Sequence, residues 1–258
     1  MKKILFVLVI CSTIFSGICN AQDSAVDRIN AGQLAFNKFT YPANILFEQK
    51  LRNFNPDLFK SNENGEFVLD FNNFKGSPYE KNTFSLGFIT DELSNKSVNI
   101  YLRYNIHNDE VELKVSLEKD EKIIALLKQH DISCTINGKY YHYSTYTDEK
   151  GIIKDGYLIQ IYKGKNYELF KHLKSTFTPK KPSENSYIPP QMAKFDTTVL
   201  YYLKQGTTVF YLPEKSKLLY SKFGNQSPAL KSYLSHKGTT LKQENDFVEV
   251  VKLLDSAN

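Results

Sequence analysis

The sequence predicts an α+β protein that is mainly β: an antiparallel meander that forms a sandwich or a partly open barrel, followed by two or three short C-terminal helices. Between residues 66 and 212, short runs alternate apolar and polar residues, and turn-forming residues separate them. Beyond residue 213 the apolar residues recur at helical spacing. With 41% hydrophobic and 24% charged residues in 258, the chain has the composition of one globular domain and not of a disordered protein.

Residues 1–21 have the pattern of a secretory signal peptide. Lys2 and Lys3 precede an uncharged, mostly apolar run from Ile4 to Ile18, and Ala21 ends a short stretch suited to cleavage. The run has about 15 residues, fewer than the roughly 20 that span a bilayer, although a signal anchor is the alternative. We therefore expect an exported protein that is periplasmic, on the cell surface or extracellular.

The cysteines bear on the same segment. Cys19 ends the apolar run and is a candidate for lipidation, but Ile18 stands where a lipobox has a small residue. Cleavage after residue 21 removes Cys11 and Cys19, so Cys134 would be the only thiol and no internal disulfide would form.

Charge and hydropathy exclude two classes of partner. Removing 21 of 258 residues leaves 237 and takes two lysines, so the net charge falls from +5 to +3. This is too small to predict nucleic-acid binding. No segment after the signal peptide is long and apolar enough to predict a transmembrane helix.

After an N-terminal arm, residues 22–65, the β domain is expected at 66–212, and its clearest hairpin covers residues 98–117. Both strands alternate apolar and polar side chains around Asn108-Asp109. A two-residue loop there pairs His107 with Glu110 and places the two apolar faces together.

A second hairpin is predicted at 132–146 around Asn137-Gly138, a strong turn signal. Its register pairs Cys134 with Tyr141, and Ser133 with His142 on the opposite face. Further strands are expected at 84–90, 156–163, 166–177, 198–204 and 207–212. The proline-rich connector 178–192 is expected to wrap the surface, because proline lacks a ladder donor.

Residues 213–258 are predicted to form the helical element. A short helix is expected around 214–222. Ser227 is the expected N-cap of the next, with Gly238 as its stop. Thr240 and Gln243 resemble the capping box of a last helix, whose apolar stripe is Phe247, Val250, Val251 and Leu254.

No catalytic residue, metal ligand or cofactor site is predicted. No two of the five histidines lie within four residues of each other, so a local two-histidine metal motif is absent. Cys134 and His142 fall on opposite faces, and His107, Asp109 and Glu110 read as an ordinary polar turn. Nucleophile-elbow and phosphate-loop patterns are missing. A hydrolase site assembled from distant residues stays open as an alternative.

Candidate binding residues come from the polar faces of the two hairpins. Tyr101 and Arg103 lie on the first face, and Tyr140 and His142 lie on the second. If the faces adjoin, they form an aromatic and cationic platform for a glycan, a peptide or another envelope protein. Seven lysines against two glutamates between 204 and 244 indicate a solvated helical face or an anionic partner.

Three stretches of the sequence belong together: Lys75-Gly76-Ser77-Pro78-Tyr79 with Phe84; 102–110; and the tail with Tyr201-Tyr202, Lys217-Leu218-Leu219 and Val250-Val251. With these stretches the chain resembles a family of uncharacterised exported β-rich proteins of Bacteroidetes-type bacteria. The resemblance implies a location in the cell envelope and no activity.

Together these patterns predict a non-enzymatic exported protein that acts by binding in or outside the cell envelope. The alternatives are the secreted hydrolase and a structural or assembly protein that acts through its C-terminal helices. The sequence does not predict an oligomeric state.

Overall fold

The computed structural model describes residues 70–118, 123–183, 187 and 189–257, together with the backbone of three short strands, β1 (Thr40–Tyr41), β2 (Phe59–Ser61) and β3 (Phe67–Leu69). The chain divides into two compact units, Met1–Thr40 and Tyr41–Asn258, and the description below concerns the second. The predicted signal peptide, Cys19 and most of the predicted arm lie outside the described residues.

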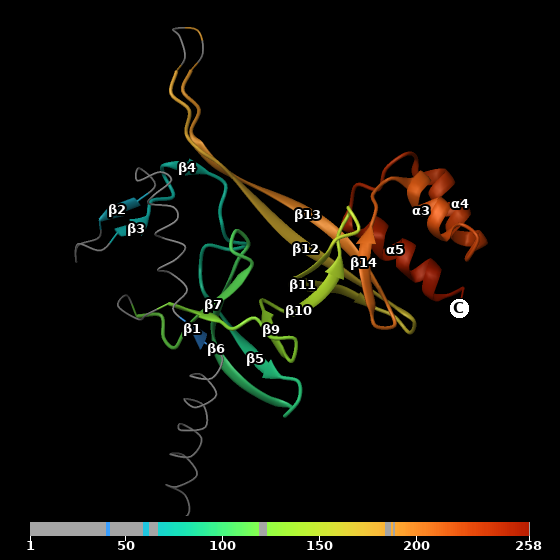
Figure 1. The fold of residues 1–258 in the computed structure, drawn as a ribbon, viewed down its shortest axis with the longest axis horizontal. Coiled ribbons are helices and arrows are strands. Elements are labelled where there is room, and N and C mark those ends of the chain that lie inside the picture. Colours follow the sequence, from blue (N-terminus) through green and yellow to red (C-terminus); the bar gives the residue numbers. More distant parts are fainter. Residues whose placement is uncertain are drawn as a thin grey trace, which may run out of the picture. The chain divides into compact units, whose positions relative to one another are not determined.

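The described chain is mainly β, with three short C-terminal helices, as the sequence predicts (Figure 1). The helices are α3 (Ser216–Phe223), α4 (Pro228–Lys237) and α5 (Glu244–Asp255). The remaining strands are β4 (Phe74–Lys75), β5 (Ser85–Asp91), β6 (Lys96–Asn105), β7 (Glu110–Lys114), β8 (Ile124–Leu126), β9 (Ile132–Ile136), β10 (Lys139–Thr147), β11 (Ile153–Lys163), β12 (Tyr167–Thr178), β13 (Ala193–Gln205) and β14 (Thr208–Leu212).

One large sheet contains these strands in the order β8-β7-β6-β5-β9-β10-β11-β12-β13-β14. Strands β10 to β14 form an antiparallel meander that closes on itself through a parallel contact between Thr147 and Phe210. The result is a partly open barrel that continues through β10 into the β5–β9 half of the sheet. Short β4 adds a parallel pairing to β13.

Two apolar clusters stabilise the barrel half. One cluster consists of Tyr146, Leu158, Phe170, Tyr202 and Val209, which alternate with outward-facing residues on the barrel strands. In the second, α3, α4 and α5 bury their apolar stripes against β12, β13 and β14; its members include Leu203, Leu219, Leu234, Phe247 and Val251. Short helices gain their stability from such packing, so these helices belong to the core of this domain.

The predicted N-cap of α4 is confirmed, whereas the predicted N-cap of α5 is not. Ser227 caps α4 and its hydroxyl accepts the Leu230 N–H at 3.2 Å, as predicted. The predicted capping role of Thr240 is wrong, because the N-cap of α5 is Gln243, three residues later, and the helix begins at Glu244. The Asp246 carboxylate accepts the Gln243 N–H at 3.2 Å, and an acidic side chain in the first turn also suits the helix dipole.

The second hairpin has the predicted register. Cys134 pairs with Tyr141 and Ser133 with His142. Asn137 and Gly138 both have positive φ, 52° and 75°, which is the conformation that a type I′ turn requires.

The predicted register of the first hairpin is wrong by two residues. Glu110 pairs with Asn105 and not with His107. The loop is longer because Asp109, at φ 53°, turns its carboxylate to accept the Tyr104 hydroxyl at 2.6 Å and the Tyr157 N–H at 3.2 Å. A register shift of two residues preserves the alternation of side chains between the two faces of the sheet, so each side chain keeps its predicted face.

The proline-rich connector does not wrap the surface. It closes the long β12–β13 hairpin, and Lys181 and Gln191 exchange two backbone hydrogen bonds that prolong the ladder toward the tip (Figure 1). Tyr187 in this loop is 95% exposed.

Candidate functional site

The sheet register brings the polar faces of the two hairpins together. Strand β5 lies between β6 and β9, and β9 pairs with β10. Phe88 is therefore flanked by Asn99 on one side and Thr135 on the other, and Thr135 pairs with Tyr140. We call this surface the open sheet face, and its residues are Leu86, Phe88, Asn99, Tyr101, Thr135, Tyr140 and His142.

The centre of the open sheet face is apolar. Leu86 is 63% exposed and Phe88 is 42% exposed. Tyr101 and Tyr140 are half-buried, one on either side of this apolar centre. Three strand spacings and an offset of two residues along the strands place them about 16 Å from each other. Exposed apolar side chains bounded by polar and aromatic residues are characteristic of interaction surfaces.

Sequence reasoning missed Leu86 and Phe88. The strand was predicted, but the run Leu86-Gly87-Phe88-Ile89 gives no clean alternation from which to assign its faces. The available signal was Gly87. A Cβ at this position would lie 2.2 Å from the Thr135 carbonyl oxygen, so Gly87 points into the packed side and its neighbours point outward.

Arg103 has the predicted face, but its guanidinium is already engaged. It donates to the Glu112 carboxylate at 2.5 and 3.1 Å and to the Asn82 carbonyl at 3.0 Å. The rings of Tyr79 and Phe84 cover it, with centroids 3.7 and 4.3 Å from the guanidinium carbon. Arg103 therefore holds the loop at residues 79–84 against β6 and offers no free cation to a ligand.

Tyr140 and His142 border a polar cluster around Glu92. The Glu92 carboxylate accepts the Tyr140 hydroxyl at 3.0 Å and also the Ser133 hydroxyl. The rings of Tyr140 and His142 lie nearly parallel, 9° apart. Burial is the main reason that the pKa of Tyr140 is raised and that of His142 is lowered, so both side chains are favoured in their neutral forms.

Among the described residues, this cluster lacks the arrangement of a catalytic triad. His142 Nδ1 lies 2.6 Å from the Ser144 hydroxyl, which is within reach for a base and a nucleophile. The nearby carboxylate of Glu92 is bonded to Ser133 and Tyr140, and it does not orient the imidazole as a triad acid would. Cys134 is buried on the opposite face, and burial raises its pKa, which keeps the thiol protonated.

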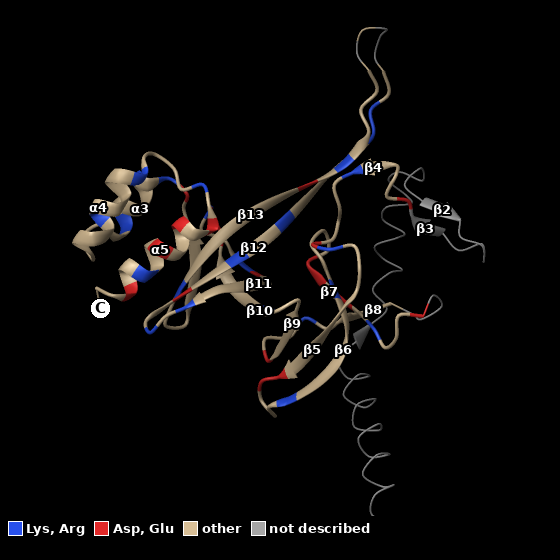
Figure 2. Cartoon of the chain, turned by 180° about the vertical axis from the view of Figure 1, so that it is seen from behind, with Lys and Arg blue, Asp and Glu red and all other residues tan. Residues whose placement is uncertain are grey.

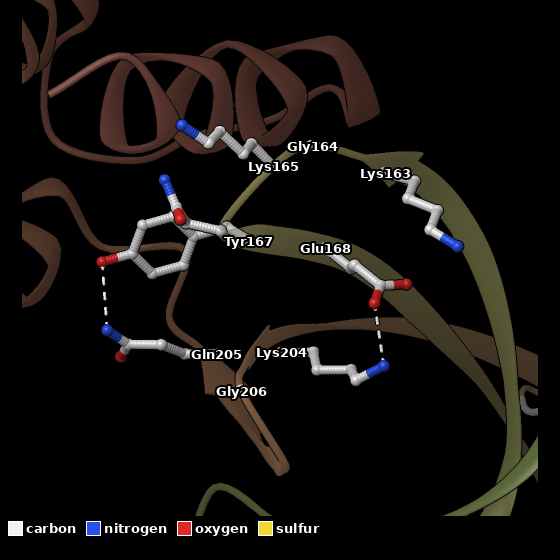
Figure 3. Close-up of a pocket in the computed structure, with 9 residues that line it drawn as sticks. Lys163, Gly164, Lys165, Tyr167, Glu168, Lys204, Gln205 and Gly206 are labelled. Carbon is white, nitrogen blue, oxygen red and sulfur yellow. Dashed lines mark hydrogen bonds and ion pairs between the residues drawn. The ribbon is translucent and has the colours of Figure 1, made fainter. Parts of the chain in front are cut away.

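A separate pocket of about 560 Å³ lies where the β11–β12 and β13–β14 turns meet (Figure 3). Its lining is mostly polar and includes Lys163, Lys165 and Gln205. Glu168 in its wall accepts Lys204 at 2.8 Å, and Gln160 donates to the other carboxylate oxygen at 2.7 Å. The pocket therefore combines lysine ammonium groups with a carboxylate that is already paired.

The backbone donors of the β11–β12 turn are used internally. The Asp255 carboxylate, at the end of α5, accepts the N–H groups of Lys165, Asn166 and Tyr167 at 2.6 to 3.2 Å. These bonds hold the pKa of Asp255 below its ordinary value. These bonds attach the end of α5 to the turn. Because the three amides of the turn are already bonded, its contribution to ligand recognition in the pocket would come from side chains.

Helices α3 and α4 contain four lysines and no acidic residue (Figure 2). Lys237 pairs with Asp246 of α5 at 2.5 Å, and the Lys222 ammonium lies 3.8 Å from the centre of the Phe210 ring. Several of these charges therefore serve the fold, as expected for the solvated side of helices that pack on a sheet.

In the part of the chain that the structure describes, no group of three or more histidine, cysteine, aspartate or glutamate side chains is arranged to hold a metal ion. Nor is any described helix long and apolar enough to cross a membrane. Comparison with known proteins finds no matching family model, no matching curated protein and no matching solved structure.

Proposed function

We propose that the chain is an exported, non-enzymatic binding protein of the cell envelope, and that it recognises a partner polypeptide through the open sheet face. The observation that carries this proposal is the exposure of Leu86 and Phe88 at the centre of a continuous four-strand surface. Export rests on the sequence of residues 1–21.

The chemistry of the face favours a polypeptide over a glycan. Leu86 and Phe88 have no hydrogen-bonding side-chain atoms, so they suit apolar side chains of a partner. Tyr101 and Tyr140 supply the aromatic residues in which protein interfaces are enriched. Asn99 and Thr135 add hydrogen-bonding groups beside the apolar centre.

The binding proposal also accounts for the polar cluster beside the face. Glu92 uses its carboxylate to fix Ser133 and Tyr140, so the Tyr140 ring is held in place before a partner arrives. A pre-ordered aromatic side chain loses less entropy on binding than a mobile one.

The proposal is tested by placing a photo-reactive benzoylphenylalanine at Phe88 and exporting the protein in its native host. Ile153 is the matched control site, because it is 72% exposed on the β11 strand and lies outside the open sheet face. We expect a discrete cross-linked polypeptide from position 88 and none from position 153.

A second variant tests whether apolar contact holds the partner. Leu86→Ser should reduce the cross-link from position 88, whereas Ile153→Ser should leave it unchanged. Thermal melts of both variants check that the fold is retained. Equal cross-linking from positions 88 and 153, or no cross-link from either, would contradict the proposal.

The pocket at the barrel turns supports saccharide binding as a second candidate function. Its volume of about 560 Å³ falls within the range of small-ligand sites, and its lining is polar. A glycan array probed with the whole protein tests this candidate: Lys163→Ala should abolish any signal at this pocket, and Lys194→Ala, on the distant part of β13, should not. An array without signal would reject it.

A further inference from the structure

Strand β6 has an open edge next to the open sheet face. It pairs with β5 from Lys96 to Leu102, but with β7 only from Tyr101 to Asn105. On the side away from β5, Lys96–Ile100 therefore has no neighbouring strand in the described part of the chain. Val98, at the middle of this edge, is 38% exposed. An unpaired strand edge presents alternate backbone N–H and C=O groups that are ready to pair with another strand.

The edge is open because β7 ends early. Strand β7 stops at Lys114, although the alternation of its sequence continues through Val115, Ser116 and Leu117. The following chain turns away instead, and the Lys114 ammonium donates to the Glu118 carbonyl at 3.3 Å. Val115 and Leu117 are left 60% and 59% exposed.

The register that β7 would have if it continued beyond Lys114 shows what kind of strand fits the edge. If the β6–β7 pairing continued beyond Tyr101 and Lys114, Val115 would face Ile100 and Leu117 would face Val98. Both pairs lie on the packed side of the sheet, where Val98 adjoins Ile89 and then Cys134. Ser116 would face Asn99 on the open side. A fitting strand therefore alternates apolar residues toward the core with polar residues toward the open face.

We propose that Lys96–Ile100 is a strand-addition site that binds an extended segment of the partner polypeptide, with apolar side chains at every second position. This inference rests on the proposed function, since it specifies how the partner is held. The added strand continues the existing β6–β7 ladder, and its polar positions lie beside Asn99, so the strand and the open sheet face form one binding surface.

A second copy of this chain fits the same edge less well. Two β6 edges paired antiparallel about Val98 would place Lys96 of each copy opposite Ile100 of the other, on the packed side. That arrangement sets an ammonium beside apolar side chains, which is unfavourable. A heterologous segment avoids this conflict when it places apolar residues opposite Val98 and Ile100 and a polar residue opposite Lys96.

The test measures amide hydrogen exchange of residues 96–100 in the whole protein, with and without a synthetic peptide. The peptide has the sequence of residues 115–120, which contains the alternation of Val115 and Leu117 and leaves out residues 112–114, whose pairing positions on β6 are occupied by β7 itself. The control peptide has serine at these two positions. We expect the first peptide to slow exchange by about tenfold at alternate amides only, because the amides between them already bond to β5.

A charged residue in the edge provides the matched variant. Val98→Lys should abolish the protection, because lysine on an edge strand opposes pairing. Leu86→Ser should leave the protection intact, because its side chain projects from the sheet face. Protection of all five amides in the free protein, an equal effect of both peptides, or dimerisation that accounts for the protection would overturn the proposal.

The cross-linking experiment separates this inference from the function on which it rests. If Val98→Lys preserves the cross-link at position 88 while Leu86→Ser weakens it, the partner binds the face without strand addition, and only this inference fails. If neither variant changes the cross-link, both proposals fail.

Discussion

Replacing Arg103 with methionine should destabilise the protein far more than a surface substitution does. The side chain of Arg103 is 11% exposed and that of its partner Glu112 is 1% exposed. The substitution removes two bonds to the carboxylate and the contacts with the Tyr79 and Phe84 rings. The Glu112 carboxylate then keeps only the Asn105 amide, at 2.8 Å, as a hydrogen-bond partner.

The expected loss follows from the charge that remains. Removing one partner of a buried ion pair costs about 3–5 kcal/mol, because the other charge is left uncompensated in a poorly solvated site. For a domain of this size, each kcal/mol lowers the melting temperature by roughly 2–4 °C. Arg103→Met should therefore lower it by about 6–20 °C.

Urea denaturation followed by circular dichroism measures the loss. Lys114→Met is the control, since Lys114 lies on the neighbouring strand and is only partly buried; its cost should stay below about 1 kcal/mol. Adding Glu112→Gln to Arg103→Met should recover most of the stability, because the buried charge is gone while the acceptor for Asn105 remains. A cost for Arg103→Met no larger than that of the control would refute the assignment of Arg103 to the fold.

Three further expectations test the fold. Leu113→Asp should cost more than about 3 kcal/mol in urea denaturation, because Leu113 is fully buried, whereas Lys114→Asp should cost less than about 1 kcal/mol; equal costs would contradict the assigned faces. The stability difference between the wild type and Asp255→Asn should be greatest near pH 7 and shrink below about pH 4 in urea titrations, because a lowered carboxylate pKa stabilises the fold above the ordinary value of 3.8 and this contribution is lost as the pH falls. Maleimide should modify Cys134 only as fast as the protein opens, and immediate labelling would show that the thiol is accessible.

The two hairpins show what sequence patterns predict and what they miss. At Asn137-Gly138 the turn residues alone set the register, because few residue pairs adopt two positive φ angles readily. At Asn108-Asp109 the local pattern was compatible with two registers of the same parity. The choice depends on the contacts of Asp109 with Tyr104 and with the backbone of Tyr157, 48 residues away, which no local pattern reveals.

The candidate site divides in the same way. Alternation correctly placed Tyr101 and Tyr140 on one side of each hairpin, but which strand lies between the hairpins is decided by long-range pairing. Because β5 lies between β6 and β9, the two polar faces form one surface with Phe88 at its centre. Arg103 was assigned to binding because its local pattern resembles that of an exposed cation. Its partner Glu112 lies nine residues away, and the loop that covers it comes from residues 79–84.

The open sheet face is best understood by following the same side of the sheet into the barrel. On β10, the side chains that begin at Tyr140 and His142 continue to Tyr146, which packs with Leu158 in the closed part. There the sheet curls and buries apolar residues on this side. In the β5–β9 half, where it does not close, most positions on this side are occupied by residues that suit water, such as Asn99.

Leu86 and Phe88 depart from that rule, because they are apolar and remain 63% and 42% exposed among the described residues. A solvent-facing strand gains nothing in stability from two exposed apolar side chains, and it becomes more prone to aggregation. Their retention beside an unpaired strand edge is what a binding surface requires, because the apolar contact and the backbone pairing can be made by the same partner segment. The exposed side of β5 and the open edge of β6 are therefore more economically explained as one site than as two separate imperfections of the fold.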